Sequence, residues 1–150
     1  MTVLFPEDQT KAAFAARWLS RPVKDGNTLS LQILAQIFDY RLLLTGDCTS
    51  EVEQALVREG TWPETDLLKV AHHGSGKTTQ MPFLEQTKPQ AAVITVGAYN
   101  RYGHPAQIVL DNLKAVDCMI WRTDLHGAVR WQVWPASWEL SAMAGTPDEN

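Results

Sequence analysis

Hydrophobic and polar positions alternate in short runs along this chain, and the runs predict strands separated by helices. Alternating and apolar residues at 29–38 and 41–45, interrupted by Asp39 and Tyr40, predict a β-hairpin. Later short apolar runs, each bounded by turn-forming or polar residues, predict further strands. These runs lie at residues 66–71, 91–96, 118–122 and 128–133.

Helical spacing of apolar residues appears between these strands. Residues 6–19 and 105–116 each carry an apolar stripe typical of an amphipathic helix, and Pro105 suits the first position of the second one. Residues 82–86 predict at most one or two helical turns. Residues 97–104 and 123–127 are expected to be loops that follow strands.

A further helix is predicted by its end signals. Thr49 and Ser50 can satisfy free N–H groups at its start, Glu53 can reach back toward them, and Gly60 supplies the stop. The resulting order of elements predicts an α/β (α+β) fold, with a mixed β-sheet covered by helices on one face. We expect one domain over residues 1–150, with residues 136–150 forming a flexible tail.

The charge balance limits the classes of partner. The net charge is -4 and the pI is about 5.5, which argues against bulk electrostatic attraction to nucleic acid. Any such contact would be local, through Lys69, Lys77, Arg101 and Arg122.

Localisation signals and cysteine pairs are not evident. No apolar run approaches the ~20 residues of a membrane-spanning helix, and the N-terminus lacks the pattern of a secretory signal. The chain by itself is therefore expected to be soluble and untargeted. Cys48 and Cys118 have no zinc-type spacing and are interpreted as buried thiols.

The main chemical signal is a carboxylate and a histidine pair that follow two apolar strands. Asp47 ends the run Leu42-Leu-Leu-Thr-Gly-Asp47, and His72 and His73 end the run that begins at Leu67. Asp47 and His73 are 26 residues apart, the length of one α-β crossover, so their strands can lie side by side. Carboxylate and imidazole are ligands of zinc-type metals. Adjacent side chains on an extended strand end point to opposite faces, so we assign His73 as ligand and His72 to a supporting or substrate-facing role.

The segment Gly74-Ser-Gly-Lys-Thr-Thr79 resembles a phosphate-binding loop only superficially. The required first glycine is replaced by Ala71, and Pro82 follows too soon for the helix that should begin after the lysine. A nucleotide-binding enzyme is therefore the least favoured interpretation. Backbone N–H groups of this turn could still contact a substrate phosphate.

Three more polar residues follow later strands. His104, Asp124 and His126 are each weak signals alone, since a single loop histidine is more often a surface or capping residue. Together they suggest that several strand ends converge on one rim. There they would supply general acid or base groups beside a metal or phosphate.

Five ordered motifs between about Asn27 and Trp131 carry a family resemblance. They resemble the C-terminal half of the metallo-β-lactamase-fold domain found at the end of DNA-internalisation competence proteins of the ComEC type. The motifs are Asn27-x-x-Ser-Leu31, Leu42-Leu-Leu-Thr-Gly-Asp47, Leu67-Leu-Lys-Val-Ala-His-His-Gly-Ser75, Val96-Gly-Ala-Tyr-Asn-Arg-Tyr-Gly-His-Pro105 and Arg122-Thr-Asp-Leu-His-Gly127.

The resemblance implies an αββα sandwich with a dinuclear zinc or manganese centre in a hydrolase acting on DNA. It implies that Asp47 is a bridging metal carboxylate and that His73, or His72, is the last histidine ligand. It further implies a parent protein embedded in the cell or inner membrane, with this domain on the outer, periplasmic or extracellular side.

One departure from the family pattern is large. The first ligand cluster, His-x-His-x-Asp-His or a variant, has no counterpart, because no histidine precedes position 72. A catalytic zinc needs about three protein ligands, so we expect either a fragment of a longer polypeptide or a half-domain that binds metal weakly and is not a competent hydrolase by itself. If the cluster were supplied, Asp47 and His73 would hold metal, and His72, His104 and Arg101 would face the phosphodiester.

A second interpretation belongs to a different class. Half a sandwich would leave apolar strands uncovered on one side, and large exposed apolar patches seldom persist on monomers. The chain would then be a binding or assembly module without enzymatic activity, and the isolated chain would form a homo-oligomer.

Overall fold

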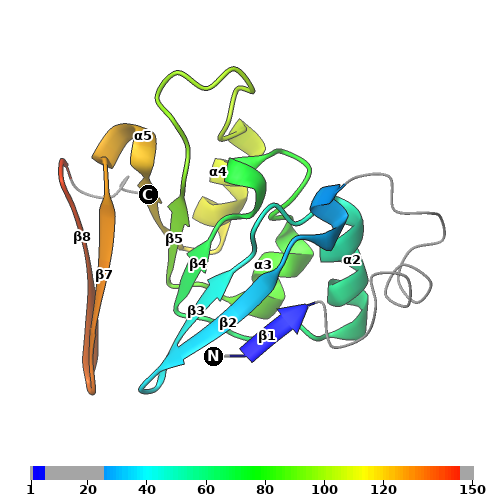
Figure 1. Ribbon diagram of the computed structural model, residues 1–150, viewed down its shortest axis with the longest axis horizontal. Coiled ribbons are helices and arrows are strands. Elements are labelled where there is room, and N and C mark those ends of the chain that lie inside the picture. The colour runs from blue at the N-terminus through cyan, green and yellow to red at the C-terminus, as the bar shows by residue number, and fades with distance from the viewer. Residues whose placement is uncertain (1, 6–25, 146–150) are drawn as a thin grey trace.

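A mixed sheet forms the centre of the molecule. The computed structural model describes residues 2–5 and 26–145. Neighbouring strands of a six-stranded sheet follow chain order, antiparallel from β1 to β3 and parallel from β3 to β6 (Figure 1). The strands are β1 (Thr2–Phe5), β2 (Gln32–Ile37), β3 (Tyr40–Leu44), β4 (Leu67–Lys69), β5 (Ala91–Ile94) and β6 (Met119–Arg122).

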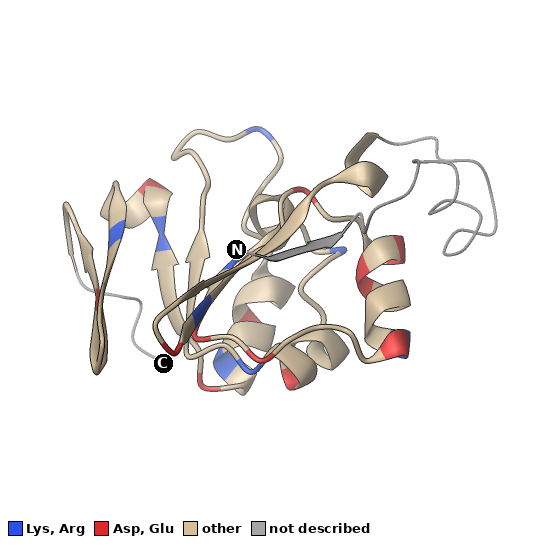
Figure 2. Ribbon diagram, turned by 60° about the horizontal axis from the view of Figure 1, so that its bottom comes forward, with Lys and Arg blue, Asp and Glu red and all other residues tan. Residues whose placement is uncertain are grey.

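Three helices cover one face of this sheet, namely α2 (Ser50–Glu59), α3 (Met81–Thr87) and α4 (Gln107–Ala115) (Figures 1 and 2). Leu43, Leu68, Ala92 and Ile120 lie opposite one another in register across β3 to β6, and all four are fully buried. Because residues in register share a face of the sheet, this row points at the helices. The helices contribute Val52, Leu56, Phe83, Leu84, Val109 and Leu113 to the same core cluster.

The other face of the sheet is apolar but only partly covered. Ile33 and Leu44 are register partners, as are Ala35 and Leu42, and all four side chains are half-buried. Ile37, at the end of β2, and Met119, on the edge strand β6, are more than 40% exposed. We call the incompletely buried apolar residues of this surface the open face: they are Ile33, Ala35, Ile37, Leu42, Leu44, Val93 and Met119. Leu67, Ala91 and Trp121 lie on the same side but are buried, and Lys69 lies between Leu44 and Val93.

A separate two-stranded sheet stands beside the β6 edge (Figure 1). It consists of β7 (Val129–Trp134) and β8 (Ser137–Ala142), which pair antiparallel. The predicted strand at 128–133 is thus present, but it pairs with β8 and not with the main sheet. The expected tail at 136–150 contains the strand β8, and residues 146–150 lie outside the described part of the chain.

Most elements agree with the sequence pattern. The predicted α+β class, with a mixed sheet and flanking helices, is confirmed, as are the hairpin of β2 and β3 and the helix that ends before Gly60. The helix expected from Pro105 begins instead at Gln107, because Ala106 has an extended backbone (φ -69°, ψ 143°) and forms the N-cap. The helix predicted at 6–19 falls outside the described residues.

Several short elements were not predicted, among them the 3₁₀ turn η1 (Gly26–Leu29). The strand β1 precedes the first predicted helix, and residues expected as a loop form the single helical turn α5 (Thr123–His126). Both cysteines are free and buried as expected, and burial raises the pKa of each thiol. Within the described residues, no helix has the length and apolarity that crossing a bilayer requires.

Glu53 serves a different helix from the one expected. Thr49 makes no side-chain capping bond, and Glu53 lies four residues after it, one position beyond a capping box. The buried Glu53 carboxylate instead accepts the Thr79 N–H at 2.6 Å and the Gln80 N–H at 3.0 Å, where α3 begins. It therefore supplies acceptors for free N–H groups that α3 cannot satisfy internally.

This buried carboxyl should make stability depend on pH. Burial raises the pKa of Glu53 to about 7, against the opposing effect of the Gln80 and Thr79 N–H groups. The folded state then holds a proton that the unfolded state releases near pH 4.5, so stability is greatest below that pH and falls as pH rises through about 7.

We expect Glu53→Gln to abolish this component, which is on the order of 3 kcal/mol. Urea unfolding of wild type and variant at pH 4.5 to 8 measures it as a wild-type-minus-variant difference that declines over this range. Glu85→Gln, at an exposed position of α3, is the control and should leave the wild-type profile unchanged. A flat difference curve for Glu53→Gln would contradict the assignment.

Candidate metal and substrate site

The candidate site lies where β3 and β4 end. These strands are parallel neighbours, so their carboxyl ends meet at the same edge of the sheet, as the 26-residue separation predicted. β3 continues into Gly46 and Asp47, and β4 continues into the 3₁₀ turn η2 (Ala71–Gly74), which carries His72 and His73. The Asp47 Oδ1 and His73 Nε2 atoms are 3.5 Å apart.

The Gly46 carbonyl joins the two strand ends. It accepts the backbone N–H of His72 and the Lys69 ammonium, each at 3.1 Å. The next N–H, that of Asp47, donates to Ser30 Oγ at 2.8 Å. Gly46 has φ +55°, and a Cβ there would stand 2.5 Å from Ser30 Oγ, so the turn that aims Asp47 requires glycine.

Lys69 is held inside this junction. Burial lowers the pKa of Lys69, and the nearby Asp47 carboxylate opposes that shift. The sequence suggested Lys69 as a local nucleic-acid contact, yet its ammonium group bonds the Gly46 carbonyl. Its position among apolar strand residues was the available signal for an internal role.

His73 is oriented by a second bond. Its Nδ1 lies 2.6 Å from the Thr95 carbonyl, which can only accept, so Nδ1 must carry the proton. Nε2 is thereby the atom that faces Asp47, and it can take part in an ion pair or offer its lone pair to a metal. The His73 and Asp47 side chains are 47% and 39% exposed, so a solute can reach both. The sequence did not indicate a role for Thr95, because every residue has a backbone carbonyl and the residue type does not show which carbonyl accepts a bond from His73.

The backbone of η2 is unusual at both histidines. His72 and His73 have φ of 47° and 55°, a left-handed conformation that non-glycine residues adopt rarely and at a cost in free energy. The extended alternation used to separate their roles therefore does not apply, although His73 is the one beside Asp47. Gly74 follows at φ +83°, where an added Cβ would stand 2.7 Å from Pro105 Cβ.

Two further predicted residues lie close to this pair. The His72 ring centroid is 6.5 Å from that of His73 and 6.2 Å from that of His104. Burial, with the neighbouring His72 and His73, lowers the pKa of His104, which favours its neutral ring. Arg101 is exposed in the same loop as His104. The structure thus gathers Asp47, His72, His73 and His104 in one region.

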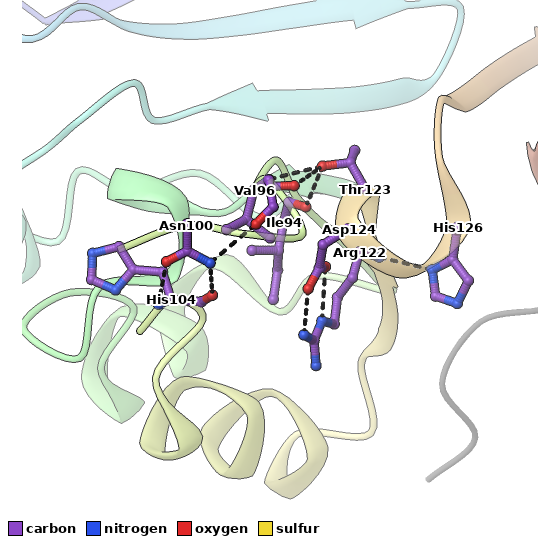
Figure 3. Close-up of polar contacts among 9 residues, drawn as sticks. Ile94, Val96, Asn100, His104, Arg122, Thr123, Asp124 and His126 are labelled. Atoms are coloured by element: carbon purple, nitrogen blue, oxygen red, sulfur yellow. Dashed lines mark hydrogen bonds and ion pairs between the residues drawn. The ribbon is translucent and has the colours of Figure 1, made fainter. Parts of the chain in front are cut away.

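The other two predicted residues have different partners (Figure 3). The Arg122 guanidinium donates to both Asp124 carboxylate oxygens, at 3.1 and 2.6 Å, and the Asp124 side chain is only 9% exposed. The buried His126 accepts the Arg122 N–H at Nδ1 and packs edge-on against Trp121. These contacts hold the β6–α5 corner together and do not bring either residue beside Asp47.

The Asp47–His73 geometry suits two positions of a metal centre. Metal–ligand bonds of about 2.0–2.2 Å at a tetrahedral angle place neighbouring ligand atoms about 3.4 Å apart, close to the observed 3.5 Å. Within residues 2–5 and 26–145, no three His, Cys, Asp or Glu side chains are grouped closely enough to hold an ion. The described residues therefore fit part of a centre and not a complete one.

Sequence comparison finds relatives among competence proteins. The chain is 36% identical over 106 residues to ComE operon protein 3 of Bacillus subtilis, a match that covers 71% of this chain and 14% of that protein. It is 35% identical over 91 residues to competence protein ComA of Neisseria gonorrhoeae, covering 60% of this chain and 13% of the relative. It is 34% identical over 104 residues to recombination protein 2 of Haemophilus influenzae, covering 69% and 13%.

These relatives support a relationship to a competence and DNA-uptake family. No protein-family model matches the chain. The chain spans about one seventh of the length of the relatives that it matches.

Proposed function

We propose that this chain contributes two ligands to a metal-dependent phosphodiesterase centre, as the C-terminal half of a metallo-β-lactamase-like αββα domain. The observation that carries the proposal is the 3.5 Å approach of Asp47 Oδ1 and His73 Nε2 at the ends of two parallel strands. Strands are rigid, and ligands delivered from them keep the spacing that a shared ion requires.

The surroundings of the pair support ligation over a simple surface ion pair. Metal-bound histidines usually donate their second ring nitrogen to a carbonyl or carboxylate, which fixes the tautomer, and His73 makes such a bond to Thr95. An exposed ion pair contributes little to stability. The left-handed backbone at His72 and His73 costs free energy, and Gly74 is closely packed. The small stabilisation from an exposed ion pair would not account for these features.

The sheet and the relatives support the domain assignment. Helices cover one face, and the open face is apolar, as the inner face of one sheet of a sandwich would be. In the proposed αββα arrangement, a second sheet from outside the described residues would cover it and bring the remaining metal ligands. The family relationship to competence proteins agrees with a DNA phosphodiester as substrate.

The chemistry divides between the metal and this chain. Bound zinc or manganese would supply Lewis acidity toward a phosphodiester, in a dinuclear centre once the other ligands are present. His72 and His104, which lie near the pair, and Arg101, which is exposed in the loop of His104, would bind and orient the phosphate. Asp124 and His126 receive no chemical role here, because their side chains bond Arg122.

The proposal treats the described residues as insufficient for hydrolysis. Two ligands fall short of the three that a catalytic zinc takes from protein. The activity of a whole protein, its place on the outer side of a membrane and its access to incoming DNA would therefore depend on parts beyond these residues.

Metal titration tests the Asp47–His73 pair. We expect Mn²⁺ to broaden the NMR signals of Asp47 and His73 before others, with an affinity weaker than roughly micromolar because the ligand set is incomplete. Asp47→Ala and His73→Ala should each remove this selective broadening.

Asp39→Ala is the matched control for this titration, since Asp39 is an exposed carboxylate in the β2–β3 turn, and it should leave the broadening unchanged. Broadening that follows all exposed carboxylates equally would contradict the paired site. A stoichiometric site of micromolar or tighter affinity would contradict the view that ligands are missing.

A second candidate function, a self-associating assembly module, is favoured by the open face. Its apolar residues run across four strands, and Ile37 and Met119 are 43% and 41% exposed. Contiguous apolar surface of this kind marks association sites on soluble proteins. A homo-oligomer would cover it without any metal chemistry.

Light scattering decides this candidate. Ile37→Lys, on the open face, should shift an oligomer toward monomer, because association would bury an unpaired ammonium group. Ile108→Lys is the matched control: Ile108 is 49% exposed but lies on α4, so this change should leave the oligomer intact. A wild-type chain that is monomeric at high concentration would rule out the module.

A further inference from the structure

A pocket of about 380 Å³ adjoins the Asp47–His73 pair. Its volume lies at the lower end of the range for small-molecule sites. Its walls come from the ends of β4 and β5, the loop after β5 and the start of α5, and they include no acidic residue. The lining residues are His73, Thr95, Val96, Gly97, Asn100, Tyr102, His104 and Thr123.

Two polar side chains of this pocket, those of Asn100 and Thr123, are bonded within the protein (Figure 3), whereas the buried Nδ1 of His104 has no hydrogen-bond partner among the described residues. Asn100 Oδ1 accepts the His104 N–H at 2.9 Å, and its Nδ2 donates to the carbonyls of His104 and Gly97 at 2.7 and 3.1 Å. Thr123 Oγ1 accepts the Val96 N–H and donates to the Val96 carbonyl, both at 2.8 Å. Their N–H and O–H groups are thus all used within the protein, so neither side chain can donate a hydrogen bond to a ligand.

The pocket does offer an aromatic surface. Tyr102 is 83% exposed, and its ring is stacked on that of His104 with centroids 5.9 Å apart and planes 22° apart. The stack places a flat, largely exposed ring on the wall of a pocket that His73 also lines. Tyr99 is 98% exposed in the same loop but does not line the pocket.

We propose that this pocket receives one unpaired base of single-stranded nucleic acid, stacked on Tyr102 without preference among bases. The inference rests on the proposed function, because it requires that the neighbouring Asp47–His73 pair be where a phosphodiester is held. A nucleotide joins a flat base to a phosphate, and here an aromatic pocket wall adjoins the Asp47–His73 pair at which the proposed function places the phosphodiester.

Charge and bonding define the kind of recognition. The chain carries a net charge of -4, which argues against bulk electrostatic attraction to a nucleic-acid backbone, so stacking must contribute a large share of the binding. Stacking tolerates any base, since every base has a π face. A paired base in a duplex is enclosed by its neighbours and would have to be extruded before it could enter.

Fluorescence anisotropy with labelled single-stranded dT10 and dA10 tests this pocket, using the full chain in buffer that contains EDTA. Tyr102→Ala should weaken the binding of both oligonucleotides by roughly ten-fold. Tyr102→Phe, which keeps the ring, should stay within about two-fold of wild type. Tyr99→Ala should bind as wild type does.

EDTA removes metal, so the outcome of this binding test does not depend on whether Asp47 and His73 bind metal in the titration. The proposal would be overturned if Tyr99→Ala weakened binding as much as Tyr102→Ala does, or if Tyr102→Ala bound as wild type does. It would also be overturned if the wild-type chain did not bind. A preference of ten-fold or more between the two oligonucleotides, or tighter binding of the dA10–dT10 duplex, would overturn it as well. Tyr102 is exposed, so its variants should keep the wild-type circular dichroism spectrum.

Discussion

The candidate site depends on one backbone oxygen, the carbonyl of Gly46. It accepts the His72 N–H from the following strand end and the Lys69 ammonium from the strand itself. Two donors from β4 on one acceptor after β3 fix the relative position of the two loops that carry Asp47 and His73. Without this junction, parallel pairing would bring the strand ends to one edge but would not set the 3.5 Å between the side-chain atoms.

The sequence predicted the frame of this site better than its details. Apolar runs gave the strands, and the 26-residue crossover placed Asp47 beside His73, because a crossover of that length joins adjacent parallel strands. The orientation of His73 could not be predicted, since it depends on the Thr95 carbonyl and on left-handed backbone torsions that no residue type required. The next residue, Gly74, meets a segment distant in sequence, because its carbonyl accepts the Ala106 N–H.

Local partners account for the remaining differences. Asp124 and His126 follow a strand and were expected at the rim, but Arg122 bonds both of them. The sequence pattern does not show whether a side chain bonds a residue close to it in the chain or joins a site formed with distant segments. Glu53 shows the reverse case: a residue expected to cap its own helix lies one position too far along and instead supports the start of α3.

The central claim is that His73 presents Nε2 to Asp47, with its proton held on Nδ1 by Thr95. Long-range ¹H–¹⁵N correlation spectra of the neutral imidazoles, combined with nuclear Overhauser effects, test it most directly. The account predicts that His73 carries its proton on Nδ1 and that its ring protons show contacts to the Asp47 methylene. A neutral His73 ring protonated on Nε2 in place of Nδ1, or a ring without contacts to Asp47, would contradict it.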